Sequence, residues 1–274
     1  MGRRVARAIL AAAAAGATVA GFGLTAAGTA GAATRPTPPA LHLPAAVAAG
    51  TAAGRAPVVV TNNQAAGYFT ALADNWRFRS VATTVPVAAC AIAPTKNPVG
   101  LVQLFGGANT TWSAEIAVFC NGGVGSIVFF DQKSATTTAR GAFVLSPRAG
   151  DRLRIGIGRN VAGHQDSFGV TNLRTGRSQT VRVTTSTAVV YRHAFLGAAV
   201  INSNADLTPR PATRKLLWAF GTSRVVTYGG VRGTLLGPWS TAELVDRVGA
   251  VTFMFPSALS AGGAGFSTFL HAAS

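Results

Sequence analysis

Two long segments of this chain alternate between apolar and polar residues. One runs from Phe143 to Gly158 and the other from Phe168 to Val183. Turn-forming residues interrupt them, namely Pro147, Gly150-Asp151 and Thr175-Gly176. A period of two puts every second side chain on the same face, which is typical of strands that bury one face and expose the other. The two segments therefore predict adjacent hairpins in an antiparallel sheet.

The rest of the chain follows the same pattern. Short runs with strand character, such as Pro57–Thr61 and Ser113–Phe119, are separated by turn signals about every eight to twelve residues. The one helical prediction is Ser240–Arg247, because Ser240 and Glu243 have the spacing of a capping box. We expect an all-β fold, an antiparallel β-sandwich of the concanavalin or lectin-like type, with at most one short helix.

The N-terminal region predicts export. Three arginines among the first seven residues precede an apolar run rich in Ala and Gly, and Ala30-Gly31-Ala32 matches a signal-peptide cleavage site. A membrane anchor is the alternative, although the run is short for a span. We predict a signal peptide at residues 1–32, an Ala/Pro-rich linker or propeptide at 33–56 and a single β-sandwich domain at 57–274. The mature chain would then be extracellular or associated with the cell envelope.

Cys90 and Cys120 are the only cysteines of the chain. In an oxidising compartment such a pair usually forms a disulfide. Closing a loop of about 30 residues would contribute roughly 3–4 kcal/mol in the chain-entropy model. Two buried free thiols are the alternative. A metal site is not expected, because no His or further Cys lies at ligand spacing, and no cofactor motif is present.

The chain is strongly basic, with a formal net charge of +16 that comes almost entirely from arginine. Such a surface attracts polyanions, for example anionic cell-wall polymers, acidic lipids or nucleic acid. The arginines are scattered over single strands and turns and no nucleic-acid motif is present, so a specific nucleic-acid partner is not expected. The alternative is that the arginine usage reflects only a genome rich in GC. We expect a monomer.

Acidic residues are scarce, with eight in the chain. Glu115 stands out because it lies in an alternating run, Trp112–Phe119. It is either an exposed strand residue paired with a cross-strand arginine or a carboxyl group with a function. The four histidines are far apart in the sequence and no G-x-S-x-G motif is present, so a Ser-His-Asp triad is not expected.

The order of short motifs resembles that of the eqolisin family of glutamic peptidases. The motifs extend over roughly Gly67 to Ile201, and each is short. They are Asn75-Trp76, Ser80–Pro86, Val102–Gly106, the Glu-containing run Trp112–Phe119, Ser146-Pro147 with Gly150-Asp151, and Asn172-Leu173 with Thr175-Gly176. The resemblance implies an exported β-sandwich peptidase active at acid pH. It also implies that the Gln103 amide stabilises the oxyanion and that Glu115 is the matching carboxylate.

One motif of that family is missing. The segment in register with the late motif is His193–Ala198, with Ala194 and Ala198 where eqolisins have glutamates. A peptidase of this kind needs a carboxyl group to deprotonate the attacking water and then to protonate the leaving amine. Gln103 donates a hydrogen bond but cannot move a proton. Glu115 would take the role only if it faced Gln103 across the sheet.

These observations support three functions. The first is a degenerate, non-catalytic relative that binds a peptide or a glycan in a groove formed by Gln103, Glu115, Trp112, Asn75 and Trp76. The second is an active acid endopeptidase of the glutamic type that uses Gln103 with Glu115 as a displaced carboxylate, so whether the chain is an enzyme stays open. The third is a structural protein of the cell envelope that is held there by its basic charge.

Overall fold

The computed structural model describes residues 57–62, 65–70, 76–87, 99–106, 112–121, 124–132, 138–186, 188–199 and 213–271. Several predictions lie outside these residues, namely the signal peptide, the linker at 33–56 and the groove residue Asn75. The predicted Cys90–Cys120 disulfide also lies outside them, because Cys90 is not among the described residues. Within them there is no helix of the length and hydropathy needed to cross a membrane.

One sheet, the first sheet, is built from the segments that alternate most regularly. Its strands follow the spatial order β10 (Ser178–Thr184), β9 (Gln165–Asn172), β8 (Arg152–Asn160), β3 (Phe78–Pro86) and β12 (Lys215–Thr227), with the short β13 (Arg232–Gly233) beyond β12. All these pairings are antiparallel, so the strands predicted within Arg152–Gly158 and Phe168–Val183 are confirmed. The strand character predicted before Pro147 is wrong, because residues 143–151 form a loop and β7 ends at Ala142. Gly176 closes the β9–β10 turn with a φ of 70°, which a residue with a Cβ rarely adopts.

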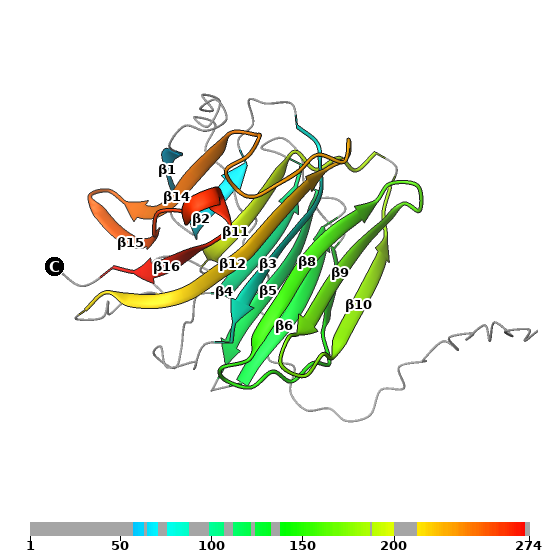
Figure 1. Ribbon diagram of the computed structural model, residues 1–274, viewed down its shortest axis with the longest axis horizontal. Coiled ribbons are helices and arrows are strands. Elements are labelled where there is room, and N and C mark those ends of the chain that lie inside the picture. Colours follow the sequence, from blue (N-terminus) through cyan, green and yellow to red (C-terminus); the bar gives the residue numbers. More distant parts are fainter. Residues whose placement is uncertain are drawn as a thin grey trace, which may run out of the picture. The chain divides into compact units, whose positions relative to one another are not determined.

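The second sheet contains the remaining strands. Their order is β16 (Phe266–Leu270), β15 (Val251–Pro256), β14 (Thr241–Val248), β2 (Ala65–Thr70), β11 (His193–Ala199), β4 (Val99–Phe105), β5 (Ser113–Asn121), β6 (Val124–Gln132) and β7 (Thr138–Ala142), and β1 (Val58–Asn62) pairs in parallel with β14. Figure 1 shows β8, β9 and β10 beside β3 and β12, with β4, β5 and β6 in the layer behind them. The two sheets form an antiparallel β-sandwich, which confirms the predicted fold class.

Strand β12 belongs to both sheets. Its first half pairs with β16 and its second half with β3. The register shifts between Gly221 and Arg224, and Thr222 there has a φ of 54°. Such a bulge bends a strand and increases its twist, which allows one strand to continue from one layer into the next.

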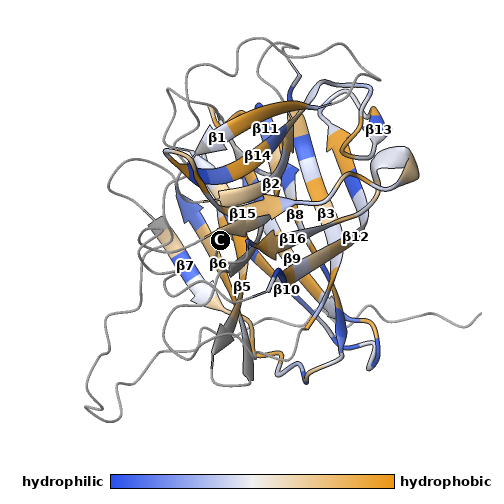
Figure 2. Ribbon diagram, turned by 90° about the vertical axis from the view of Figure 1, so that its left-hand side faces the viewer, coloured by the Kyte–Doolittle hydropathy of each residue, from blue (hydrophilic) through white to orange (hydrophobic). Residues whose placement is uncertain are grey.

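One hydrophobic core fills the space between the sheets. Its members are the inward residues of both, for example Val81, Ile155 and Phe168 from the first sheet and Val102, Ile116 and Leu196 from the second. Phe129 of β6 meets Phe168 of β9 with ring centroids 5.1 Å apart. Each large apolar side chain buried in this way contributes about 1.5–3 kcal/mol. Figure 2 shows hydrophobic and hydrophilic residues following one another along the strands, as expected where inward and outward side chains alternate.

The helix predicted at Ser240–Arg247 is wrong. This segment forms strand β14, in which buried and half-buried residues alternate from Ala242 to Asp246. Glu243 is not in a capping box. Its carboxyl group instead accepts a hydrogen bond from the Tyr68 hydroxyl at 3.4 Å. Pairing with β1, β2 and β15 satisfies the backbone of this segment from both sides, and this outweighs a local capping signal.

Candidate functional site

Gln103 and Glu115 lie directly opposite each other on strands β4 and β5. Side chains that face each other across an antiparallel pair have Cβ atoms about 4.5–5.5 Å apart, so the amide and the carboxyl group are neighbours. Val102 and Ile116, which are next to them in the chain, point into the core between the sheets. By alternation, Gln103 and Glu115 therefore lie on the outer face of the second sheet, the face turned away from the first sheet.

Apolar side chains border this pair on both sides. Phe195 of β11 is opposite Gln103, and Phe130 of β6 is opposite Glu115. Both phenylalanines belong to a second hydrophobic cluster, whose members all come from the second sheet. We call it the outer cluster; it consists of Val60, Ala65, Phe69, Ala117, Phe130, Phe195, Ala199, Ala242 and Leu244. The polar pair is thus surrounded by an apolar patch.

Burial controls the chemistry of Glu115. Both Gln103 and Glu115 are only 3% exposed. The loss of hydration raises the pKa of Glu115 from 4.5 to about 8, because the charged form cannot be solvated there. The carboxyl group is therefore mostly protonated at neutral and acid pH. Among the residues that the structure describes, the Oε1 atoms of Gln103 and Glu115 have no hydrogen-bond partner. The alternative in which Glu115 is an exposed residue paired with an arginine is wrong.

Strand β11 brings no carboxyl group to this pair. The position opposite Gln103 is Phe195, and Ala194 points into the core. His193 is on the same face as Phe195, but its Nδ1 donates a hydrogen bond to the Thr70 carbonyl at 2.6 Å. Burial lowers the pKa of His193 to about 4, so the imidazole is neutral near pH 7.

The two tryptophans predicted for the groove lie elsewhere. Trp112 and Trp76 are half-buried and pack against the core between the sheets, whereas Gln103 and Glu115 are on the outer face. Trp76 meets Trp239 edge to face, with ring centroids 5.9 Å apart. The structure therefore brings together the amide and the carboxyl group of the predicted site but not its aromatic residues.

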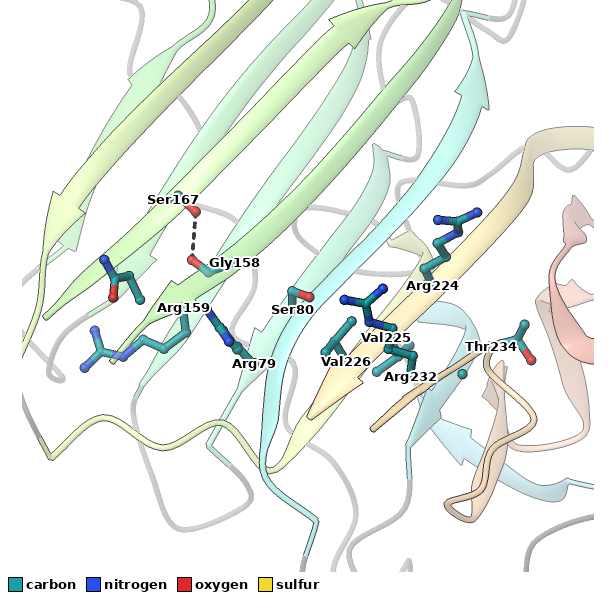
Figure 3. Close-up of a pocket in the computed structure, with 12 residues that line it drawn as sticks. Arg79, Ser80, Gly158, Arg159, Ser167, Arg224, Val225, Val226, Arg232 and Thr234 are labelled. Carbon is teal, nitrogen blue, oxygen red and sulfur yellow. Dashed lines mark hydrogen bonds between the residues drawn. The ribbon is translucent and has the colours of Figure 1, made fainter. Parts of the chain in front are cut away.

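A groove that the sequence analysis did not identify lies on the first sheet. Its volume is about 710 Å³, and it lies over β3, β8, β9, β12 and β13. Arg79, Arg224 and Arg232 line it together with Ser80 and other small residues, and Figure 3 shows them around the same strands. The sequence does place arginines at the polar positions of alternating strands. It does not show which of these arginines lie together in the folded protein.

The arrangement has a limited chemical repertoire. No group of three His, Cys, Asp or Glu side chains in the described part of the chain is placed to hold a metal ion. A neutral carboxyl group donates or accepts a hydrogen bond, as an amide does. It cannot act as a general base until it ionises.

The fold is similar to that of known glutamic peptidases. No family model and no curated protein sequence matches this chain. Scytalido-glutamic peptidase with a peptide-based transition-state analogue has 12% identity and a TM-score of 0.56, over 76% of this chain and 98% of that one. SCP-B, a member of the eqolisin family in a complex with the tripeptide Ala-Ile-His, has 11% identity and a TM-score of 0.53, over 75% and 96%. The chain therefore has an eqolisin-like fold, as its motif order predicted.

Proposed function

We propose that this protein is a non-catalytic relative of the glutamic peptidases that binds a peptide at the Gln103–Glu115 pair. The observation that carries the proposal is the geometry of the pair: Glu115 is buried opposite Gln103, and the position that faces Gln103 on β11 holds Phe195. The Glu115 carboxyl group faces Gln103, but its pKa of about 8 keeps it protonated at the acid pH where an acid peptidase works. A protonated carboxyl group cannot take a proton from water. Phe195 occupies the facing position on β11, so no second carboxyl group compensates there.

The same pair is suited to hold a peptide backbone. A buried polar atom without a partner costs about 1–3 kcal/mol, and the Oε1 atoms of Gln103 and Glu115 have none within the described part of the chain. A main-chain N–H of an extended peptide would supply the missing donor. The similar structures contain a peptide-based analogue and a tripeptide, which supports this class of ligand over a glycan. Since both side chains are almost fully buried, the groups that cover them must separate before a ligand reaches them.

The strand register favours a second candidate function, a peptidase in which Glu115 is the general base. Gln103 and Glu115 are close enough to act on one water molecule and one carbonyl group. Because the base is the ionised form, the rate would increase as the pH rises through about 8. This pH dependence is the opposite of that expected for an acid peptidase.

The test measures binding and cleavage in the same samples. The purified full chain is mixed with the tripeptide Ala-Ile-His and with a library of longer peptides between about pH 3 and 9. Calorimetry follows binding, and mass spectrometry follows products. We expect saturable binding of a peptide without cleavage at any pH. Gln103→Ala should weaken binding about tenfold, the effect of losing one buried hydrogen bond.

A matched variant controls for non-specific effects. Gln165 is a half-buried glutamine on β9 of the first sheet, and Gln165→Ala should bind like the wild type. Equal binding by Gln103→Ala and the wild type would overturn the proposal. Cleavage that rises through pH 8 and disappears in Glu115→Gln would establish the second candidate instead.

A further inference from the structure

The groove lined by Arg79, Arg224 and Arg232, which we call the arginine groove, carries a positive charge that none of the described acidic residues balances. Arg79, Arg224 and Arg232 are exposed, and none of them forms an ion pair with a residue that the structure describes. The carboxylates at the two ends of β8 are already engaged. Asp166 is buried and pairs with Arg159 at 3.7 Å, and Asp151 is held by the guanidinium of Arg174. None of the described residues that line the groove is acidic, so the positive potential of its arginines extends into solvent.

Arg159 also lines the groove, but it is part of the scaffold. Its side chain is fully buried and donates a hydrogen bond to the Ser186 carbonyl at 2.7 Å. In Figure 3 it extends away from Ser80. The charge available to a ligand therefore comes from the three exposed arginines.

A floor of small residues continues from the groove across the sheet. The register places Arg224, Ala82, Gly156, Gly169 and Thr180 in one row and Val226, Ser80, Gly158, Ser167 and Arg182 in the next. Gly156 cannot carry a larger side chain, because a Cβ there would lie 2.9 Å from the Ala82 Cβ. Ser and Thr hydroxyl groups stand between the glycines. Between β12 at one end and Arg182 at the other, the floor thus consists only of Ala, Gly, Ser and Thr, and is low and free of bulky side chains.

Arginine also stands at the far end of this floor. Arg182 on β10 is exposed and shares a row with Ser80 and Val226 of the groove. Four steps between adjacent strands, each about 4.8 Å, separate β10 from β12, which is roughly 19 Å. Arg154 on β8 is a further exposed arginine on this face. Positive charge therefore stands at both ends of the small-residue floor.

We infer that the outer face of the first sheet binds a linear anionic polysaccharide, which crosses the strands from Arg182 to the groove of Arg79, Arg224 and Arg232. Guanidinium groups bind carboxylate or phosphate with two parallel hydrogen bonds. Ser and Thr hydroxyl groups match the hydroxyl groups of a sugar chain. The low floor allows a chain of rings to lie close to the sheet. This surface is separate from the Gln103–Glu115 pair, which lies on the other sheet.

The side chains present favour a polysaccharide over single-stranded nucleic acid. Proteins bind single strands by stacking bases on aromatic side chains. None of the residues that line the groove is aromatic, and the two rows of the floor contain none. Charge complementarity and hydroxyl groups are what this face offers.

The test compares two triple variants with equal changes in charge. The groove variant combines Arg79→Gln, Arg224→Gln and Arg232→Gln. The control variant combines Arg148→Gln, Arg177→Gln and Arg247→Gln, which remove three exposed arginines outside the groove and the floor. Surface plasmon resonance measures binding of the full chain to immobilised polygalacturonate, which carries carboxylates, and to a phosphorylated mannan, which carries phosphates. Circular dichroism checks that the variants are folded, and Arg224→Gln alone replaces the triple variant if that one unfolds.

We expect the wild type to bind at low salt and to be released as salt increases, because exposed charges are screened. The groove variant should bind about tenfold more weakly, whereas the control variant should stay within about twofold of the wild type. The polymer that binds more tightly identifies carboxylate or phosphate as the preferred anion, and either result supports the inference. Equal weakening in both variants would mean that net charge alone is responsible, and would overturn it.

Two further measurements test the path and the class of partner. Gly169→Leu adds bulk to the floor at a position where a Cβ makes only ordinary contacts, the nearest at 3.9 Å. It should weaken polysaccharide binding severalfold without unfolding the chain, and unchanged binding would exclude the path across the floor. Tighter binding to a DNA duplex or to anionic lipid vesicles than to either polysaccharide would overturn the class of partner.

Discussion

The outer faces of the two sheets differ sharply: β8 and β9 alternate between buried and more exposed residues, whereas β2 and β11 are buried at every position. On the second sheet the outward positions hold Phe69, Phe130 and Phe195, and the Gln103–Glu115 pair among them is almost fully buried. On the first sheet they hold glycine, serine, threonine and arginine, and this face is open. Alternation determines which residues share a face. The size and polarity of the outward residues decide whether that face is covered or solvated.

This difference separates two kinds of recognition. The covered face changes the chemistry of its polar groups, since burial keeps Glu115 protonated and leaves oxygen atoms without partners. The open face keeps its arginines charged and accessible. A ligand of the covered face must displace the groups that now bury Gln103 and Glu115. A ligand of the open face is attracted over a distance by the charge of the arginines.

Removing a ring from the covered face should have the largest effect. Phe195 is fully buried in the outer cluster, and Phe195→Ala should lower the free energy of unfolding by about 3–5 kcal/mol. Thr180→Ala, at an exposed position on the open face, should change it by no more than about 0.5 kcal/mol. Urea unfolding followed by fluorescence measures both. Similar losses would mean that the two faces do not differ in this way.

The glycines of the two faces should also respond differently. A Cβ on Gly197 would lie 2.3 Å from the Ala66 carbonyl oxygen, so Gly197→Ala should force β2 and β11 apart and cost about 3 kcal/mol. On the open face, the nearest atom to a Cβ on Gly169 is 3.9 Å away. Gly169→Ala should therefore leave the midpoint of thermal unfolding almost unchanged. If Gly197→Ala left the stability unchanged, this would argue against the close approach of β2 and β11.

The protonation of Glu115 predicts a pH-dependent stability. The unfolded chain loses this proton near pH 4.5 and the folded chain near pH 8. The folded state thus binds more protons between these values, and stability decreases as the pH rises from about 4.5 to about 8. Glu115→Gln should remove this loss and make the protein more stable at pH 7 by on the order of 2–3 kcal/mol.

The control for this effect is the pH itself. At pH 4 both states of the wild type are protonated, so Glu115→Gln and the wild type should unfold at nearly the same urea concentration. Glu243→Gln serves as the matched variant; burial also raises the pKa of this half-buried carboxyl group, so it should gain stability at pH 7 in the same direction but less than Glu115→Gln. A gain for Glu115→Gln that is equal at pH 4 and pH 7 would rule out the buried protonated carboxyl group.

The smallest effect on stability is expected on the open face. Arg182→Gln removes an exposed charge, and it should change the free energy of unfolding by less than about 0.5 kcal/mol in either direction. Calorimetric melting at low salt measures this change. A loss above 1 kcal/mol would show that the arginine supports the fold rather than a ligand.

The sequence by itself determined the local features. Period-two alternation predicted β8, β9 and β10, and Thr175-Gly176 predicted the turn that joins β9 to β10. Repeated turn signals indicated a sandwich, and the order of short motifs indicated its eqolisin-like type. The local signal failed at Ser240–Arg247, where the spacing of a capping box predicted a helix. That segment is a strand because β1, β2 and β15 pair with it, and these neighbours are not visible in a local window.

The tertiary structure decided which residues meet and which face is covered. The sequence identified Gln103 and Glu115 but not that they are opposite each other, because the register of β4 and β5 follows from pairing and not from either strand alone. It likewise contained Arg79, Arg224 and Arg232 without showing that β3, β12 and β13 bring them together. A strand specifies two faces. Only packing against other strands determines which face is buried, and burial sets the pKa of a carboxyl group and the accessibility of an arginine.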